Sequence, residues 1–545
     1  MNELSSLFLN IKDGDTVTLR KDRVYDVRPE DSFIKKGFFC SNSAKKEENP
    51  DGTRYSAIYL KNKKNITIDG NGATILVHGK MTPMLFYGCE RLTVKNLTID
   101  YAVPTMTEFT VLERNEDQVI IKINPDCLFE VDGNTLYWKG EDDENGDPYW
   151  KNASSAPKRF VKVLDPVTEV TRDFRREDLS FSEIQFAGEN TLKCTLMSKE
   201  TVLNKGEIVQ TRNIIRDQVG SMSERCRDIT FENLRIMFMH GLGMVSQYCE
   251  NVTFRSCDLT PKQGRTIAST ADFFQFSGCR GTLTIENCRA AGAQDDYVNV
   301  HGTHLSVTKA DYNANSLLLS FRHPETWGFQ AYEKGDIIEF IRWDTLIPYG
   351  KAEVLSYEKV SDTEIKVFTD SLPEGIAEGN DAVENASWTP DVIIRNCDFG
   401  RTSGRGILAT TRGEVIIENN RFYKLWGPAL LIEDDCNFWF ESGYTNHITF
   451  RNNDVISCNF NCNSKGAPVI QYSPKVMNEE SEEFVHGRLS VCNNRFLSPV
   501  YGKHTLSLSY LRKAEIYNNT FDREYEIFTK CVGKIEDKNN TVLSQ

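Results

Sequence analysis

Three aspartates near the middle of the chain have the residue type and spacing needed for acid–base chemistry. The segments TADFFQFSGC (270–279) and QDDYVNVHGT (294–303) align without gaps, so Asp272 and Asp296 are 24 residues apart and Asp295 adjoins Asp296. If 24 residues make one coil of a stacked β-structure, the first two lie about 5 Å apart at the backbone. Carboxylates this close raise one another's pKa, and such a cluster is costly to keep unless it is used.

The reaction that suits such a cluster is glycoside hydrolysis. One protonated carboxyl gives its proton to the leaving oxygen, while ionised carboxylates activate a water molecule. Inverting enzymes separate these roles by about 6.5–9.5 Å, and we expect Asp295, whose strand parity is opposite to that of Asp272 and Asp296, to provide the gap. The alternatives are an acidic turn and a Ca²⁺ site.

Four residues near the aspartates are candidate sugar ligands. Gln275, Asn299 and His301 share outward strand parity beside the acids, and turn capping is their alternative role. Arg405 aligns with Asp296 if an intervening insertion is skipped, which places a cation over the carboxylates. We favour a contact with a sugar hydroxyl for Arg405, and a simple ion pair is the alternative.

Glu433 and Trp439 are two further candidates, from the segment LLIEDDCNFWFESG (430–443). Glu433 follows an apolar strand and could accept a hydrogen bond from a sugar, although a surface role is nearly as good an explanation. Trp439 could stack on the apolar face of galactose, with a core position as its alternative. We expect Asp434 and Asp435, which have no partner one coil away, to form a solvated turn.

A short repeat surrounds these candidates and indicates the element that must position them. An alternating apolar strand followed by an Asn-centred turn recurs as LTVKNLTI (92–99), LTIENCRA (283–290), VIIENNRF (415–422), LSVCNNRF (489–496) and AEIYNNTF (514–521). Short strands at this period, with almost no helical periodicity, indicate a β-solenoid. We therefore predict an all-β fold, a right-handed parallel β-helix.

Stacked coils bring residues one repeat apart into columns. The Asn pairs that begin at 419, 452, 493 and 518 should form amide ladders. Two sets of cysteines should also share columns: 257, 288 and 397 in one, and 89, 249 and 279 in the other. We interpret the cysteines as small buried packing residues rather than a metal site, because free Cys packs well in cores and no His/Cys set has zinc-like spacing.

Two intervals between repeats are too long for one coil. The segments NTLKCTL…NKGEIVQ (190–210) and NSLLLSF…EKGDIIEF (315–340) within them resemble each other and contain strands and turns. We interpret them as two small antiparallel β-barrels inserted into the solenoid. The expected order is coils in 1–103, barrel in 104–217, central coils with the aspartates in 218–302, barrel in 303–388 and coils in 389–545.

Composition limits the class of partner. The chain has 545 residues, 64 Lys+Arg and 78 Asp+Glu, giving a formal charge of −14. This acidic balance argues against nucleic acid, and the absence of a long apolar run argues against a membrane span. We expect a neutral glycan partner and no cofactor or metal. The N-terminus shows no signal-peptide pattern, which favours the cytoplasm, or a secreted or periplasmic protein if a leader was removed.

The segment DFFQFSGCRGTLTIENCRAAGAQDDYVNVHGTH (272–304) resembles glycoside hydrolase family 110, the α-1,3-galactosidases that act on blood-group-B-type and related glycans. RGILATTRGEVIIENNRF (405–422) is similar too. The resemblance implies an inverting β-helix enzyme with inserted barrels that needs no metal or cofactor. It implies that Asp272, Asp295 and Asp296 are catalytic, with Asp295 as the acid and the other two holding the water.

Two other functions remain open from the sequence. A polysaccharide lyase or epimerase also uses a β-helix, but it needs a cation and a basic residue, and only Arg405 lies near the acids. A non-catalytic glycan-binding protein would bind without turnover. Release of galactose from galactose-α-1,3-galactose or from the group B trisaccharide distinguishes the hydrolase from both.

Overall fold

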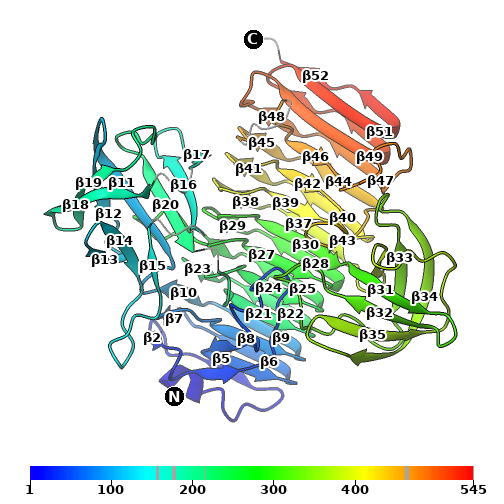
Figure 1. Ribbon diagram of the computed structural model, residues 1–545, viewed down its shortest axis with the longest axis horizontal. Coiled ribbons are helices and arrows are strands. Elements are labelled where there is room, and N and C mark those ends of the chain that lie inside the picture. The colour runs from blue at the N-terminus through cyan, green and yellow to red at the C-terminus, as the bar shows by residue number, and fades with distance from the viewer. Residues whose placement is uncertain (155–158, 175–178, 214, 461–465, 544–545) are drawn as a thin grey trace.

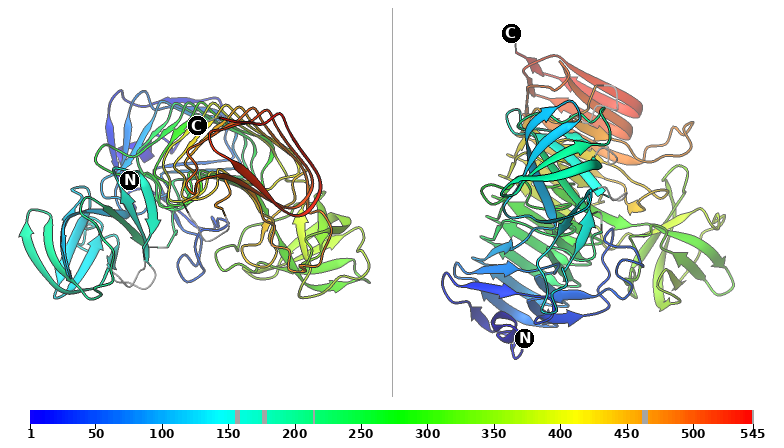
Figure 2. Two further views of the ribbon diagram at one scale, coloured as in Figure 1. Left: turned by 90° about the horizontal axis from the view of Figure 1, so that it is seen from above. Right: turned by 60° about the vertical axis from the view of Figure 1, so that its left-hand side comes forward.

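The computed structural model describes residues 1–154, 159–174, 179–213, 215–460 and 466–543, which form an elongated stack of coils with two inserts (Figure 1). Within these ranges the only α-helix is α1 (Glu3–Ser6), and no helix there is long and apolar enough to cross a membrane. The stack runs from the N-terminal coils to the C-terminal coils, and the inserts flank it on two sides (Figure 2).

Each coil contributes strands to three parallel stacks. The first stack carries Gln275, Asn299 and His301. Each of its strands pairs with the next one along the chain, and the last is β49 (His504–Tyr517). Its other strands are β5 (Ile58–Lys61), β8 (Met84–Tyr87), β21 (Ser221–Glu224), β24 (Met244–Gln247), β27 (Phe274–Ser277), β30 (Val298–Thr303), β39 (Ile407–Ala409), β42 (Leu430–Ile432) and β46 (Ile470–Tyr472).

The second stack also ends on β49, which is long enough to pair with both, and β51 (Tyr525–Lys538) covers it. Inward residues of this stack are buried and outward ones half-buried, as the alternation of the sequence predicts. Its other strands are β1 (Thr16–Thr18), β6 (Lys64–Asp69), β9 (Glu90–Lys95), β22 (Arg227–Glu232), β25 (Glu250–Arg255), β28 (Arg280–Glu286), β37 (Asp391–Arg395), β40 (Glu414–Glu418), β44 (His447–Arg451) and β47 (His486–Cys492).

The third stack is a separate sheet of short strands, which follow the Asn turn of each repeat. The turn residues, among them Asn96, Asn233, Asn287 and Asn419, have φ from 53° to 57°, a left-handed conformation that Asn tolerates well. The strands are β2 (Val24–Val27), β7 (Thr74–Val77), β10 (Thr98–Tyr101), β23 (Arg235–Ile236), β26 (Asp258–Leu259), β29 (Arg289–Ala290), β38 (Asp398–Phe399), β41 (Arg421–Tyr423), β45 (Asp454–Ile456), β48 (Arg495–Leu497), β50 (Thr520–Phe521) and β52 (Thr541–Val542).

The predicted columns are present. Asn420, Asn453, Asn494 and Asn519 form a continuous amide ladder of side-chain hydrogen bonds at 2.9–3.2 Å. In each pair only the second Asn enters the ladder, because the first forms the left-handed turn. Cys257, Cys288 and Cys397 are buried free thiols at matching positions of successive coils, which confirms their packing role.

The first insert is antiparallel and leaves the coils after β10. A sheet of seven strands is accompanied by a smaller sheet of β13 (Leu128–Asp132), β14 (Thr135–Lys139) and β15 (Lys151–Ala153). The seven strands, in spatial order, are β17 (Val170–Asp173), β16 (Arg159–Asp165), β20 (Ile208–Asn213), β11 (Met106–Asn115), β12 (Gln118–Ile123), β19 (Thr191–Leu196) and β18 (Phe181–Gly188).

The second insert is a closed barrel that continues directly from β30. It has its own apolar core, separate from that of the coils. The strands, in spatial order, are β31 (Leu305–Asp311), β32 (Ser316–Ser320), β35 (Glu364–Thr369), β34 (Pro348–Lys359), β33 (Ile337–Ile341) and β36 (Ala382–Asn385). The parallel β-helix with two antiparallel inserts confirms the predicted fold class. Of the two predicted barrels, the second is a closed barrel, whereas the described residues of the first insert form a sheet of seven strands beside a sheet of three.

Candidate active site

Asp272 and Asp296 occupy equivalent positions on neighbouring coils, two residues before β27 and β30. These strands pair with Gln275 opposite Asn299, so the predicted 24-residue register is confirmed. The residue after each aspartate points inward: the rings of Phe273 and Tyr297 stack at 5.4 Å. This packing fixes the backbone at both aspartates, and the Asp296 N–H donates to Asp272 Oδ1 at 3.2 Å.

The three carboxylates converge on one cavity. One oxygen from each of Asp272, Asp295 and Asp296 lies within 4.8 Å of the others. The nearest oxygens of Asp295 and its neighbours are therefore closer than the separation of about 6.5–9.5 Å that we expected between the carboxyl groups. Asp295 and Asp296 lie in a bend before β30, where strand alternation does not apply, and both side chains reach the same space.

Burial distinguishes the members of the carboxylate cluster. Asp272 and Asp296 are 3% and 1% exposed, whereas the Asp295 side chain is 36% exposed. Burial raises the pKa of Asp272 well above its usual range, and the charges of Asp295 and Asp296 add to this shift. Burial likewise raises the pKa of Asp296 to about 7, against the opposing charge of Arg405.

Arg405 is the main cation of the cluster. Its Nε and Nη2 donate to the two oxygens of Asp296 at 2.6 and 2.8 Å, and Nη2 lies 3.3 Å from Asp295 Oδ1. The pairing of β30 with β39 places Arg405 one coil beyond Asp296, as the sequence alignment predicts. The bidentate geometry holds Asp296 in one orientation.

The cavity has about 450 Å³ of empty volume. It brings together eight of the nine predicted site residues: Asp272, Gln275, Asp295, Asp296, Asn299, Arg405, Glu433 and Trp439. His301 is not among its lining residues, because this buried ring lies behind Gln275 and Glu441, 3.5 and 3.7 Å from them. We call this space the inner cavity.

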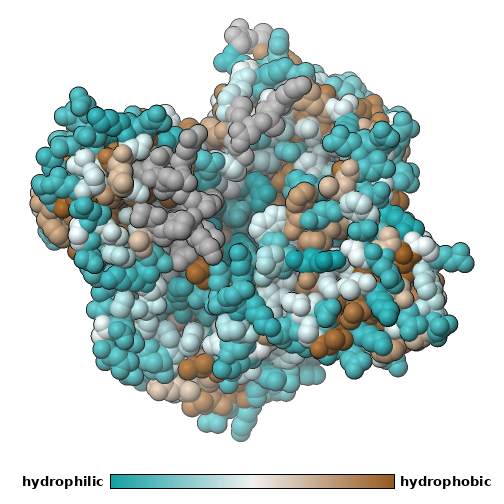
Figure 3. Space-filling view, in the orientation of Figure 1, coloured by the Kyte–Doolittle hydropathy of each residue, from teal (hydrophilic) through white to brown (hydrophobic). Residues whose placement is uncertain are grey.

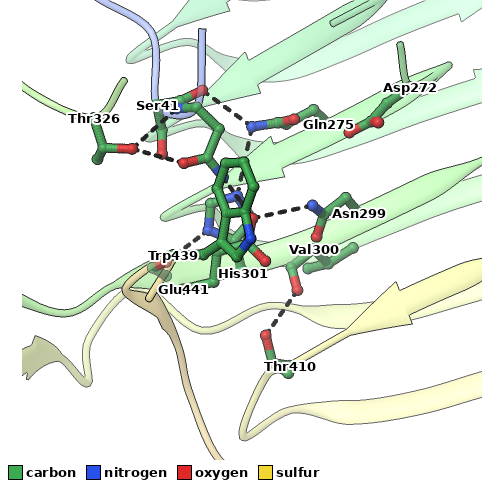
Figure 4. A network of polar contacts seen from close by, with 12 residues as sticks. Ser41, Asp272, Gln275, Asn299, Val300, His301, Thr326, Thr410, Trp439 and Glu441 are labelled. Atoms are coloured by element: carbon green, nitrogen blue, oxygen red, sulfur yellow. Dashed lines mark hydrogen bonds and ion pairs between the residues drawn. The ribbon is translucent and has the colours of Figure 1, made fainter. Parts of the chain in front are cut away.

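Polar side chains cross-link one wall of the inner cavity (Figure 4). Gln275 Nε2 donates to the Ser41 carbonyl at 3.2 Å, and Asn299 Nδ2 donates to Glu441 Oε1 at 3.3 Å. The Oε1 atom of Gln275 has no hydrogen-bond partner among the described residues. A buried amide oxygen without a partner is costly, so a hydroxyl donor from a bound sugar would relieve it.

Trp439 lies at the rim of the inner cavity and is 46% exposed. The Asp435 carboxylate accepts the backbone N–H groups of Asn437, Phe438 and Trp439 at 2.5–2.9 Å, which fixes the loop that presents the ring. Asp434 pairs with His304 at 2.8 Å, and both are buried. The predicted solvated turn at Asp434 and Asp435 is therefore wrong, because the second insert and this loop cover both carboxylates.

Glu433 has partners from the next coil. Lys475 Nζ donates to its carboxylate at 2.6 Å, and Ser473 Oγ donates at 3.2 Å. Glu433 nevertheless lines the inner cavity, so one oxygen remains available for a ligand.

Sequence reasoning missed the wall residues that come from distant segments. Asn42, in a loop before β4 (Arg54–Ser56), donates to Glu441 Oε1 at 2.5 Å and accepts a hydrogen bond from Thr326 at 2.6 Å. Arg216, which follows the first insert, pairs with Glu325 of the second at 2.5 Å. Neither lies in a coil repeat, so no periodic signal could have identified them.

A second, larger cavity adjoins the first. It has about 1320 Å³ of empty volume and lies where the first insert meets the coils. Asp295 and Arg405 line both cavities, whereas Asp272 and Asp296 line only the inner one. We call the larger space the outer cavity, and Asp295 therefore stands at the passage between the two.

Comparison with known proteins finds relatives that match most of the chain and a family model that matches one insert. A family model described as GLAA-B beta-barrel domain II matches residues 316–383, within the closed barrel. Alpha-1,3-galactosidase A of Bacteroides fragilis is 35% identical over 91% of this chain and 81% of its own length. The Bacteroides thetaiotaomicron proteins named alpha-1,3-galactosidase A and B are 35% and 29% identical over 84% and 89% of this chain, and over 78% and 77% of their own lengths.

Proposed function

Because the chain belongs to glycoside hydrolase family 110, the α-1,3-galactosidases, we propose that it releases terminal α-1,3-linked galactose by a single displacement that inverts the anomeric carbon. The substrates we propose are the blood group B determinant, linear galactose-α-1,3-galactose, or both. Family membership favours hydrolysis over the lyase and the non-catalytic binding protein.

The observation that carries the proposed mechanism is the position of the three carboxylates relative to the two cavities. Asp272 and Asp296 are buried and line only the inner cavity, while Asp295 borders both cavities. A galactosyl unit in the inner cavity with its aglycone in the outer one would place the glycosidic oxygen near Asp295.

In the proposed reaction, water attacks the anomeric carbon as the bond to the glycosidic oxygen breaks. Asp295 gives a proton to that oxygen, which leaves as the aglycone hydroxyl. Asp272 and Asp296 orient the water and accept its proton, so charge is conserved within the carboxylate cluster. Burial and like-charge repulsion raise the pKa of Asp272 and Asp296, so the free cluster holds a proton on these carboxyls near neutral pH. The proposed reaction requires that proton to reside on Asp295 once the substrate is bound.

The spacing of the carboxylates does not itself support inversion. An oxygen separation within 4.8 Å is shorter than inverting glycosidases usually show, and a carboxylate this near the reaction centre could act as a nucleophile. Support for inversion comes instead from the paired, buried Asp272 and Asp296, which can share one water between them.

The test is the anomer that forms first. Proton NMR during cleavage of galactose-α-1,3-galactose should show β-galactose before mutarotation. Initial α-galactose would mean retention through a covalent intermediate and would overturn the water-holding role of Asp272 and Asp296.

A further inference from the structure

The outer cavity lies beside the proposed galactose site and is bordered by Asp295 and Arg405. Its empty volume of about 1320 Å³, which includes space open to solvent, exceeds the 450 Å³ of the inner cavity. Because this cavity borders the proposed acid, Asp295, on the side of the leaving group, we ask which ligand its lining residues could bind.

An aromatic residue and polar side chains line the outer cavity. Trp426 follows β41, and Lys162 of the first insert places its Nζ 3.8 Å from the centroid of the indole ring. Lys162 also pairs with Asp173 on the neighbouring strand of the insert. The cation–π contact ties the indole to the insert, and the half-buried Trp426 lines the outer cavity together with Lys162.

A buried amide completes the wall between the insert and the coils. Gln294, which is 1% exposed, donates to Gln210 of the first insert at 3.0 Å and to Ser403 at 3.3 Å. Its Oε1 atom has no hydrogen-bond partner among the described residues. Gln294 thus matches Gln275 of the inner cavity, where a buried amide oxygen also lacks a partner.

These features describe a carbohydrate site rather than an apolar or ionic one. Indole rings bind the C–H face of a sugar, and amide groups bind its hydroxyls. The Lys162 and Asp173 charges neutralise each other, so a neutral ligand is favoured. On the face seen in Figure 3, the left-hand insert is mostly hydrophilic, whereas the right-hand insert also carries hydrophobic patches.

We propose that the outer cavity is the binding site for the oligosaccharide aglycone and that Trp426, held by Lys162 of the first insert, is the surface on which its first sugar stacks. This inference rests on the proposed function, because it assumes that the bond cleaved lies at Asp295. Selection among aglycones then depends on the junction between the first insert, which contributes Lys162, and the coils, which contribute Trp426.

The experiment compares substrates with and without an aglycone sugar. In Trp426→Ala, kcat/KM for galactose-α-1,3-galactose and for the group B trisaccharide should fall by about 10-fold or more, mostly through KM, since the aglycone sugar loses the ring on which it stacks. For α-galactosyl fluoride, whose leaving group has no ring to stack, the loss should be below about threefold. Trp426→Phe, which keeps an aromatic face, should recover most of the oligosaccharide activity.

The control is Val167→Ala, at an 89% exposed position on the same insert, which should leave all three substrates unaffected. Circular dichroism and the thermal midpoint show whether each variant is folded. Equal losses of Trp426→Ala on α-galactosyl fluoride and on the oligosaccharides would overturn the aglycone site. If the wild-type enzyme released no galactose from any of these substrates, the proposed function itself would fail, which is a different outcome.

If Trp426→Ala does not fold, Trp426→Phe and the Lys162→Met variant provide the test. Lys162→Met removes the cation over the ring and should raise KM for both oligosaccharides more than KM for α-galactosyl fluoride. An equal change in KM for both kinds of substrate would overturn the role of the insert.

Discussion

Asn420, Asn453 and Asn494 lie one above another on successive coils, just as Asp272 and Asp296 do nearer the N-terminus. In the Asn column, each side chain donates to the next, as when Asn420 Nδ2 donates to Asn453 Oδ1 at 3.1 Å. In the Asp column no such ladder is possible, because an ionised carboxylate only accepts hydrogen bonds.

The difference shows that one backbone register can build either a structural element or a chemical one. A neutral amide is both donor and acceptor, so stacking satisfies it and stabilises the coils. Carboxylates in the same arrangement repel one another, which raises the pKa of Asp272 and leaves Asp296 dependent on Arg405. The side chain, rather than the fold, decides which outcome a column has.

Removing one carboxylate is the largest expected effect. Asp295→Asn, Asp272→Asn and Asp296→Asn should each lower kcat by about 10²–10⁴-fold, the usual contribution of a general acid or base. Losing Asp295 should penalise poor leaving groups more than activated aryl galactosides, whereas losing Asp272 or Asp296 should affect both alike. Steady-state kinetics on both substrates measure this.

The same variants test the stability side of the comparison. The pKa of Asp272 is raised by folding, so its ionisation opposes folding above the unfolded pKa of about 3.9, and Asp272→Asn should keep or increase stability at pH 7. Asp398→Asn, an exposed aspartate on another coil, is the control and should change neither kcat nor stability. A leaving-group effect at Asp272 instead of Asp295 would reassign the acid.

Arg405→Met should shift the pH dependence. Arg405 favours the ionised form of Asp296, so removing its charge raises the pKa of that carboxyl above about 7. The base must be ionised, and the acidic limb of kcat/KM should therefore move to higher pH, by about 1–3 units for an opposite charge at this distance. A limb that stays in place or moves to lower pH would contradict the pairing of Arg405 with Asp296.

Asn453→Ala interrupts the amide ladder of the Asn column. It leaves the Asn420 N–H and the Ile417 carbonyl without their partners, at about 1–3 kcal/mol for each buried group left unsatisfied. The free energy of unfolding, measured with urea, should fall accordingly. The kcat of the folded protein should be unchanged, since Asn453 lines neither cavity; a catalytic loss in the folded variant would mean that the two columns are coupled.

Chelation should have the smallest effect. The three carboxylates are close enough to share a cation, but the proposed reaction uses them as acid and base. EDTA-treated enzyme should keep its rate, and addition of Ca²⁺ or Mg²⁺ should not increase it. A large loss that a metal restores would mean that Asp272, Asp295 and Asp296 form a metal site.

The sequence by itself determined whatever depends on the repeat. The 24-residue offset predicted Asp272 beside Asp296, and skipping the second insert predicted Arg405 above them. The Asn ladder and the cysteine columns followed from the same spacing. These inferences hold because a β-helix advances by one strand spacing for each coil, so position within a repeat fixes position in space.

Only the tertiary structure decided what surrounds those columns. The short distance from Asp295 to its neighbours follows from a bend before β30, where alternation ends. The positions of Asn42 and Arg216, and the outer cavity that Trp426 and Lys162 line, depend on how a loop and two inserts dock against the coils. Docking has no period along the chain: it is set by contacts between residues far apart in sequence, which a repeat cannot encode.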